Sequence, residues 1–263
     1  MHLTQPVSVP EVRGIESVAG GAGSPALRAL LAGPPATGTV VHAGPQAVYA
    51  DLGGAVVGVV ARGAVHVPCA VATTLTDLPD VAAGDEVTAG DGVLRVGPLG
   101  VAATRLVSFT VPRTPAAVLP DVTAELSTAR DQLPAEALAR LAAGDPAAVP
   151  ALVGRGDGLT PVGDDVLAGW LVAAHAAGRD DAAVAAAVLA HLPRTTGLSA
   201  ALLRHAVAGE AIAPFRAVLV RADAAAVAAL LAVGHSSGAG MLLGAHLALS
   251  SSITHEALEG STR

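Results

Sequence analysis

The feature that most constrains the fold of this chain is a change in sequence pattern near residue 115. Residues 37–112 form short β-prone runs separated by turn signals, which predicts a small β-barrel or sandwich. Ala- and Leu-rich segments with helical periodicity follow from residue 122, after a proline-rich stretch. The chain is therefore predicted to be α+β, with a β-barrel-like N-terminal domain over residues 1–113 and an α-helical domain over residues 122–253.

Caps and glycine stops predict where the helices lie. Before the β-rich region, Ser24, Pro25 and Gly33 indicate one short helix that a serine caps. After it, helices are expected over residues 122–132, 134–143, 161–177, 180–191, 198–208, 222–233 and 239–250. Thr160 is the expected N-cap of the third of these, and Pro161 its expected first residue.

Composition argues against several classes of function. The net charge is −7 and only 2% of the residues are aromatic, so neither the basic face nor the stacking platform of a nucleic-acid binder is present. The chain contains no lysine, which removes Schiff-base and P-loop chemistry. Its single cysteine, Cys69, is expected to be a small buried hydrophobe. Interrupted apolar runs, and residues 1–14 without a signal-peptide pattern, favour a cytoplasmic protein with no membrane partner.

Three helix starts share an unusual chemistry. They read GRGDGLTPVGDD (154–165), RTTGLS (194–199) and GHSSGAG (234–240), and each is rich in glycine and hydroxyl residues. A helix N-terminus offers free N–H groups to an anion, and each loop alone is also typical of an ordinary capped turn. Together they predict one anion pocket. Its candidate binding residues are Gly156, Gly158, Thr160, Gly163, Thr195, Thr196, Ser199, Ser236, Ser237 and Gly238.

Three residues of these loops are candidates for catalysis. His235 is the only histidine among them, so it is the expected proton donor or carbonyl-polarising group. Asp164 and Asp165 would repel an anion unless a metal, a proton or a cationic group lies between, although first-turn carboxylates are also ordinary partners of the helix dipole. The two aspartates could hold Mg²⁺, the one cofactor under consideration. We expect Asp164→Asn and His235→Ala to abolish activity with little change in thermal stability.

The three stretches, in this order, resemble the AllH family, named for a subunit of oxamate carbamoyltransferase in bacterial allantoin catabolism. The resemblance covers roughly residues 150–248, and Gly158 to Asp165 is its most specific part. This chain departs from the family pattern at Asp157, where a proline is frequent, and at Gly240, where an acidic residue is frequent. Gly240 has no carboxyl, so an acidic role at this position is not expected in this chain. The departures also leave room for a substrate that differs from that of the family.

The resemblance implies an enzyme subunit, a transferase that converts oxalurate and phosphate to oxamate and carbamoyl phosphate. Its expected partners are a small anionic substrate (phosphate, carbamoyl phosphate or an oxalurate-like compound) and the other carbamoyltransferase subunits. Two alternatives stay open from the residues themselves. One is a Mg²⁺-dependent kinase or synthetase that binds phosphate or nucleotide, and the other is a non-catalytic scaffold subunit.

Overall fold

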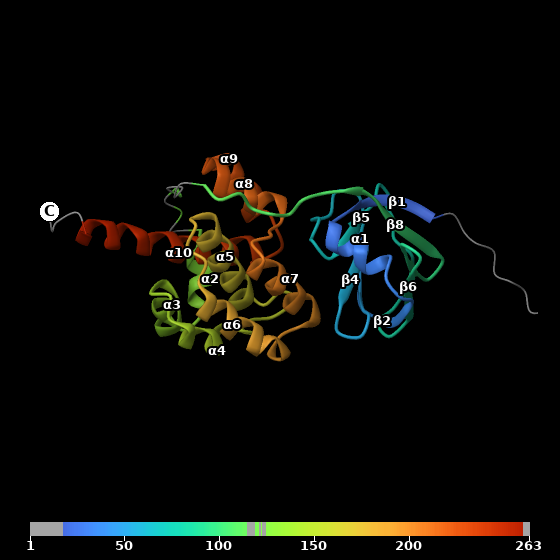
Figure 1. The fold of residues 1–263 in the computed structure, drawn as a ribbon, viewed down its shortest axis with the longest axis horizontal. Coiled ribbons are helices and arrows are strands. Elements are labelled where there is room, and N and C mark those ends of the chain that lie inside the picture. Colours follow the sequence, from blue (N-terminus) through green and yellow to red (C-terminus); the bar gives the residue numbers. More distant parts are fainter. Residues whose placement is uncertain (1–17, 115–118, 121, 123–124, 260–263) are drawn as a thin grey trace, which may run out of the picture.

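The computed structural model describes residues 18–114, 119–120, 122 and 125–259, and it shows an α+β chain (Figure 1). A β-barrel occupies one end and a group of helices the other, as predicted. Residues 1–14, which lack a signal-peptide pattern, and part of the proline-rich stretch lie outside the described residues. The division into domains at residues 113 and 122 stays a prediction.

The barrel is closed and has eight strands in the order β1-β5-β4-β3-β2-β6-β7-β8. The strands and the one helix among them are β1 (Val18–Gly23), α1 (Pro25–Leu31), β2 (Ala36–Ala43), β3 (Ala47–Asp51), β4 (Val56–Val60), β5 (Ala70–Ala72), β6 (Glu86–Gly90), β7 (Val93–Val96) and β8 (Leu99–Leu106). Neighbouring strands are antiparallel except for the pairs β1–β8 and β4–β5. The β-rich region therefore forms a barrel, and β1 extends it beyond the predicted range.

The short helix α1 confirms the capping prediction. The Ser24 hydroxyl accepts a hydrogen bond of 3.0 Å from the Leu27 N–H, and Pro25 is the first helical residue. Leu27 and Leu31 are buried in the same apolar cluster as the barrel strands. The helix thus packs on the barrel with its apolar side.

The second half of the described chain is helical. Its elements are α2 (Ser127–Asp131), α3 (Ala135–Ala142), the 3₁₀ turn Pro146–Ala148, α4 (Val149–Leu152), α5 (Val162–Ala176), α6 (Ala182–His191), the 3₁₀ turn Leu192–Arg194, α7 (Gly197–Val207), α8 (Ala213–Arg221), α9 (Ala224–Leu231) and α10 (Ser237–Glu259). Helices α4 and α8 were not predicted, because both are short and begin at or beside a proline. In the part of the chain that is described, none of the helices combines the length and the apolar character needed to cross a membrane.

The start of α5 differs from the prediction. Pro161 is the N-cap and makes no side-chain capping bond, and the helix begins at Val162. The Thr160 hydroxyl is instead 2.8 Å from the Ser237 hydroxyl of α10. Tertiary contact has therefore replaced the local cap that the sequence suggested.

Helices α5 and α10 cross at the centre of the helical part, and glycines allow the contact. A Cβ at Gly169 would lie 2.1 Å from the Met241 carbonyl oxygen, and one at Gly244 would lie 2.0 Å from that of Val166. Both distances are far below van der Waals contact, so the backbones touch only because these side chains are absent. The close packing of α5 against α10 therefore depends on these two glycines.

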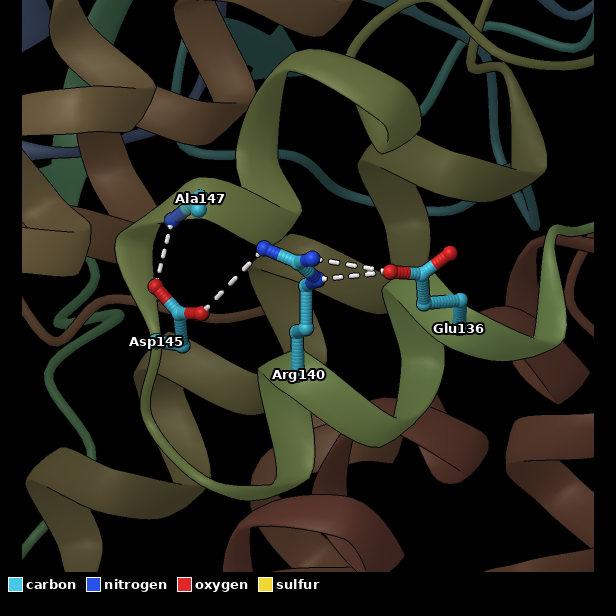
Figure 2. A network of polar contacts seen from close by, with 4 residues as sticks. All are labelled: Glu136, Arg140, Asp145 and Ala147. Atoms are coloured by element: carbon cyan, nitrogen blue, oxygen red, sulfur yellow. Dashed lines mark hydrogen bonds and ion pairs between the residues drawn. The ribbon is translucent and has the colours of Figure 1, made fainter.

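A network of polar side chains links α3 to the turn that follows its C-terminal end (Figure 2). Arg140 contacts Glu136 one turn earlier at 2.8 Å and Asp145 at 3.7 Å, and Asp145 accepts a hydrogen bond of 2.9 Å from the Ala147 N–H. These side chains are largely exposed, and exposed ion pairs contribute little stability. The network orders the turn before α4 and takes no part in the site described below.

The segment that follows β8 forms backbone hydrogen bonds with the helical part of the chain. The Val111 N–H donates to the Gly209 carbonyl, and the Ala211 N–H donates to the Phe109 carbonyl, both at 2.9 Å. Thr110 and Glu210 are therefore paired like residues of two antiparallel strands. One apolar core cluster also continues from the barrel residues Tyr49 and Val60 into the helices.

Candidate functional site

The three predicted helix starts come together around the N-terminus of α5. The Thr160 hydroxyl meets Ser237 at the start of α10, and the Thr196 hydroxyl donates to the Leu159 carbonyl at 2.5 Å. A Cβ at Gly240 would lie only 2.7 Å from the Cβ of Asp165. The acidic residue that is frequent here in the resembling family would crowd Asp165, so Gly240 gives this aspartate its space.

Asp164 links the first two loops and is 1% exposed. Its Oδ1 accepts a hydrogen bond from the Gly154 N–H at 2.8 Å, and its Oδ2 accepts one from the Ser199 hydroxyl at 2.7 Å. The Thr195 hydroxyl donates to the same Oδ2. Both carboxyl oxygens are therefore occupied by protein donors, which holds the loops together.

Several groups that were predicted to bind an anion have partners in the protein. The Gly163 N–H donates to the Arg155 carbonyl at 2.9 Å, and the Asp164 and Asp165 N–H groups donate to the Pro161 carbonyl. Three of the candidate glycines are needed because another part of the backbone lies close to them. A Cβ at Gly163 would lie 2.1 Å from the Leu152 carbonyl oxygen, and a Cβ at Gly238 would lie 1.9 Å from the Leu230 carbonyl oxygen. A Cβ at Gly156 would lie 2.9 Å from the Val162 nitrogen. Their role in anion binding stays a prediction.

A cavity of about 390 Å³ lies between the barrel and the helices, within the usual size range of small-molecule sites. The barrel side is lined by His42, Gln46, Ala47, Tyr49, Val60, Ala64, Val65, Val67 and Pro68. The helical side is lined by Leu159, Thr160, Asp165, Ala168, Val172, Leu198, Leu202, His205, Ala206, Glu210, Ala211, Ile212, Phe215, Val233, Gly234, Ser237 and Met241. Most of these side chains are apolar, so the few polar groups would orient a ligand.

Asp165 contributes a buried carboxyl to this cavity. Burial raises its pKa well above the ordinary value of 3.8, the Ser237 hydroxyl acts in the opposite direction, and the charge of Asp164 raises it again. Among the described residues, its Oδ2 has no hydrogen-bond partner. A raised pKa favours the protonated form of a carboxyl, and a protonated carboxyl can donate a hydrogen bond, as buried acids do in other active sites.

The paired aspartates thus face different surroundings. Asp164 meets protein donors, whereas Asp165 lines the cavity and burial raises its pKa. Within residues 18–114, 119–120, 122 and 125–259, no three His, Cys, Asp or Glu side chains lie close enough together to hold a metal ion. A Mg²⁺ ion held by the two aspartates together with substrate oxygens stays a prediction.

A histidine and a glutamate that were not among the predicted site residues also line the cavity. The His205 Nδ1 lies 2.6 Å from the Glu210 Oε2, and both side chains are about one-fifth exposed. His205 belongs to the last turn of α7, and Glu210 follows at the bridge to Thr110. Their spacing of five residues spans a helix end, where no periodic pattern signals a contact.

The remaining predicted residues lie outside the cavity lining. His235 is exposed, Gly158 is exposed with φ +88°, and Ser236 is half-buried in the turn before α10. Thr195, Thr196 and Ser199 serve the contacts with Asp164 and Leu159. Thr160, Asp165 and Ser237 are the predicted residues that reach the cavity.

The buried Asp165 predicts a pH-dependent stability. Above pH 3.8 the unfolded chain releases the proton that the folded state keeps, so stability falls as the pH rises toward the raised pKa. Asp165→Asn removes this loss, because an amide does not ionise. We expect the variant to melt above the wild type at pH 7.5, with a smaller difference at pH 5, in thermal denaturation followed by circular dichroism. Asp157→Asn, at an exposed position, is the control, and parallel pH curves for wild type and Asp165→Asn would contradict the assignment.

The segment that forms the helical side of the cavity matches a known protein family. Residues 152–249 match the family described as "Oxamate carbamoyltransferase subunit AllH". The match confirms the resemblance over the segment that runs from the end of α4 into α10 and contains all three loops. No curated protein and no solved structure matches the chain.

Proposed function

We propose that this chain is a cytoplasmic subunit of an oxamate-type carbamoyltransferase, which converts oxalurate and phosphate to oxamate and carbamoyl phosphate in purine and allantoin nitrogen catabolism. The observation that carries the proposal is that the family match and the helical wall of the cavity fall on the same segment of the chain. The segment that matches the carbamoyltransferase subunit family also supplies the helical wall of the cavity, with Thr160, Asp165 and Ser237.

The polar groups of the cavity suit an amide. Oxamate and oxalurate carry amide carbonyl and N–H groups, which need donors and acceptors in one small site. The protonated Asp165 carboxyl can donate to a carbonyl oxygen, and the hydroxyls of Thr160 and Ser237 can donate or accept. Donors that face the oxygen of a carbonyl under attack stabilise its developing negative charge.

The charges of the cavity suit a subunit better than a complete enzyme. No arginine is among the described residues that line it, and the chain has no lysine. Phosphate and the oxalyl carboxylate need cationic or N–H donors, so the partner subunits would supply part of the site. In this arrangement the anion ends of the substrates face the partner subunits.

The same lack of cationic groups supports a second candidate, a non-catalytic subunit that completes the site of its partner. The kinase or synthetase alternative needs Asp164 and Asp165 to share a metal. Because Asp164 already accepts three hydrogen bonds, we favour the carbamoyltransferase.

Calorimetry on the full chain separates these functions. We expect oxamate to bind, with weaker binding to Asp165→Ala, because the variant loses the group that donates to the amide carbonyl, whereas Asn would keep an N–H donor at this position. ATP with Mg²⁺ should give no saturable heat. Saturable nucleotide binding would overturn the carbamoyltransferase in favour of the kinase, and a chain that binds neither would support the scaffold.

A further inference from the structure

The cavity contains an imidazole held by a carboxylate, and the function proposed above gives it no role. His205 and Glu210 both line the cavity, at the side where α7 ends and the chain pairs with Thr110. The Nδ1 to Oε2 distance of 2.6 Å is that of a strong hydrogen bond. A carboxylate accepts only, so Nδ1 carries the hydrogen and Nε2 is the nitrogen that can exchange a proton.

The backbone fixes this pair firmly. The Glu210 N–H donates to the His205 carbonyl at 2.9 Å, and the antiparallel bonds at Phe109 and Val111 hold the segment on both sides of Glu210. Among the described residues, His205 Nε2 has no hydrogen-bond partner. The ring is thus oriented by one nitrogen and available through the other, which is the arrangement of an oriented acid–base group.

The chain contains a second pair with the same spacing, which provides an internal comparison. The His175 Nδ1 lies 2.7 Å from the Asp180 Oδ1, also five residues apart across a helix end. Neither residue lines the cavity. The His175 ring packs against Gly209, next to Glu210, so the two pairs support the same segment.

We propose that His205 transfers the proton that carbamoyl transfer requires at the departing amide nitrogen, and that Glu210 is the positioning residue that orients its ring. The inference rests on the proposed function and adds to it the group that moves the proton. An amide nitrogen is a poor leaving group unless it gains a proton as the bond breaks, so a general acid in the cavity is needed.

The proton balance of the step is closed. An oxygen of HPO₄²⁻ attacks the ureido carbon of oxalurate, a C–O bond forms, and the C–N bond to the oxamate nitrogen breaks. The phosphate loses one proton and the departing nitrogen gains one. His205 accepts the first through Nε2 and delivers it to the nitrogen, so the ring is unchanged after each turnover.

The test uses the assembled complex that contains the full chain, with oxalurate and phosphate as substrates. We expect His205→Ala to lower kcat about 100-fold or more with little change in KM. Added imidazole should restore part of the rate, because the cavity that remains can accept it. Glu210→Gln should lower kcat by a smaller factor, since the ring stays but is less well oriented.

His175→Ala is the matched control. It removes a pair of the same geometry and a contact to the segment that carries Glu210, so a loss caused by loosening that segment would appear in it too. We expect full kcat for this variant and no response to imidazole. Thermal denaturation of each variant reports whether it folds.

The outcomes distinguish the two proposals. If the wild-type complex does not convert oxalurate, the proposed function fails. If the wild type turns over and His205→Ala keeps its rate, or loses it without rescue by imidazole in a folded protein, the role of His205 is wrong. In addition, ¹⁵N NMR of the full chain should show a shift of His205 Nε2 on addition of oxamate, and an unchanged Nε2 signal at saturating oxamate would overturn the inference.

Discussion

Asp164→Ala is expected to lower the free energy of unfolding by about 3–5 kcal/mol, although the sequence alone suggested little effect on stability for this residue. Asp164 is 1% exposed and accepts hydrogen bonds from Gly154, Thr195 and Ser199. Its removal leaves the half-buried Gly154 N–H and Thr195 hydroxyl and the buried Ser199 hydroxyl without their acceptor, and an unpaired buried group costs about 1–3 kcal/mol. For a chain of this size the melting temperature should fall by about 10 °C.

Asp157→Ala is the control for this experiment, because Asp157 is an exposed aspartate of the same loop. Its stability should stay within about 0.5 kcal/mol of the wild type. Urea denaturation followed by circular dichroism measures both variants. Equal midpoints for Asp164→Ala and the wild type would show that the carboxyl does not hold the loops together.

Ala168→Phe is expected to lower the turnover of the assembled complex about 100-fold, because even a small displacement of a substrate from the reacting groups has an effect of this size. Ala168 lines the cavity from α5, three residues after Asp165, and is half-buried. A phenyl ring there has open space beside it, so it fills the cavity with little strain on the surrounding helices. The steady-state rate with oxalurate and phosphate measures the effect.

Ala186→Phe on α6 is the matched control, since Ala186 is an exposed helical alanine outside the cavity lining. It carries the same change in helix propensity and should leave turnover unchanged. Both variants should melt within about 4 °C of the wild type, which corresponds to roughly 1–2 kcal/mol. An Ala168→Phe complex with the full rate would mean that the reaction does not use the cavity.

The class of the fold, and the loops that form one side of the cavity, could be predicted from the sequence. Turn signals and helical periodicity predicted the change from strands to helices, and the cap at Ser24 is confirmed. The glycine- and hydroxyl-rich helix starts do come together, because their side chains bond to one another across α5, α7 and α10. The chemistry of three similar loops was therefore a sound guide to which segments meet.

The different roles of the adjacent aspartates could not be predicted in this way. Successive residues of a helix point about 100° apart, so Asp164 and Asp165 meet different neighbours. Which of them meets protein donors and which meets an apolar cavity depends on α7 and α10, which lie far along the chain. A sequence pattern shows that two carboxyls are adjacent, but it does not show which side chains surround each of them.

The barrel side of the cavity and the pair His205–Glu210 were missed for a similar reason. His42 and Tyr49 lie in β2 and β3, more than 100 residues from the loops that were compared. Glu210 is placed by its pairing with Thr110, a contact between distant segments. Long-range pairing of this kind leaves no periodic signal in a single sequence.

The most direct test of the account is the conversion of oxalurate and phosphate by the complex that assembles on this chain, measured as carbamoyl phosphate formed per unit time. The account predicts turnover by the wild-type complex, little turnover with Asp165→Ala in the same complex, and none when this chain is left out. A complex that forms no carbamoyl phosphate, or one whose rate is the same with and without this chain, would contradict it.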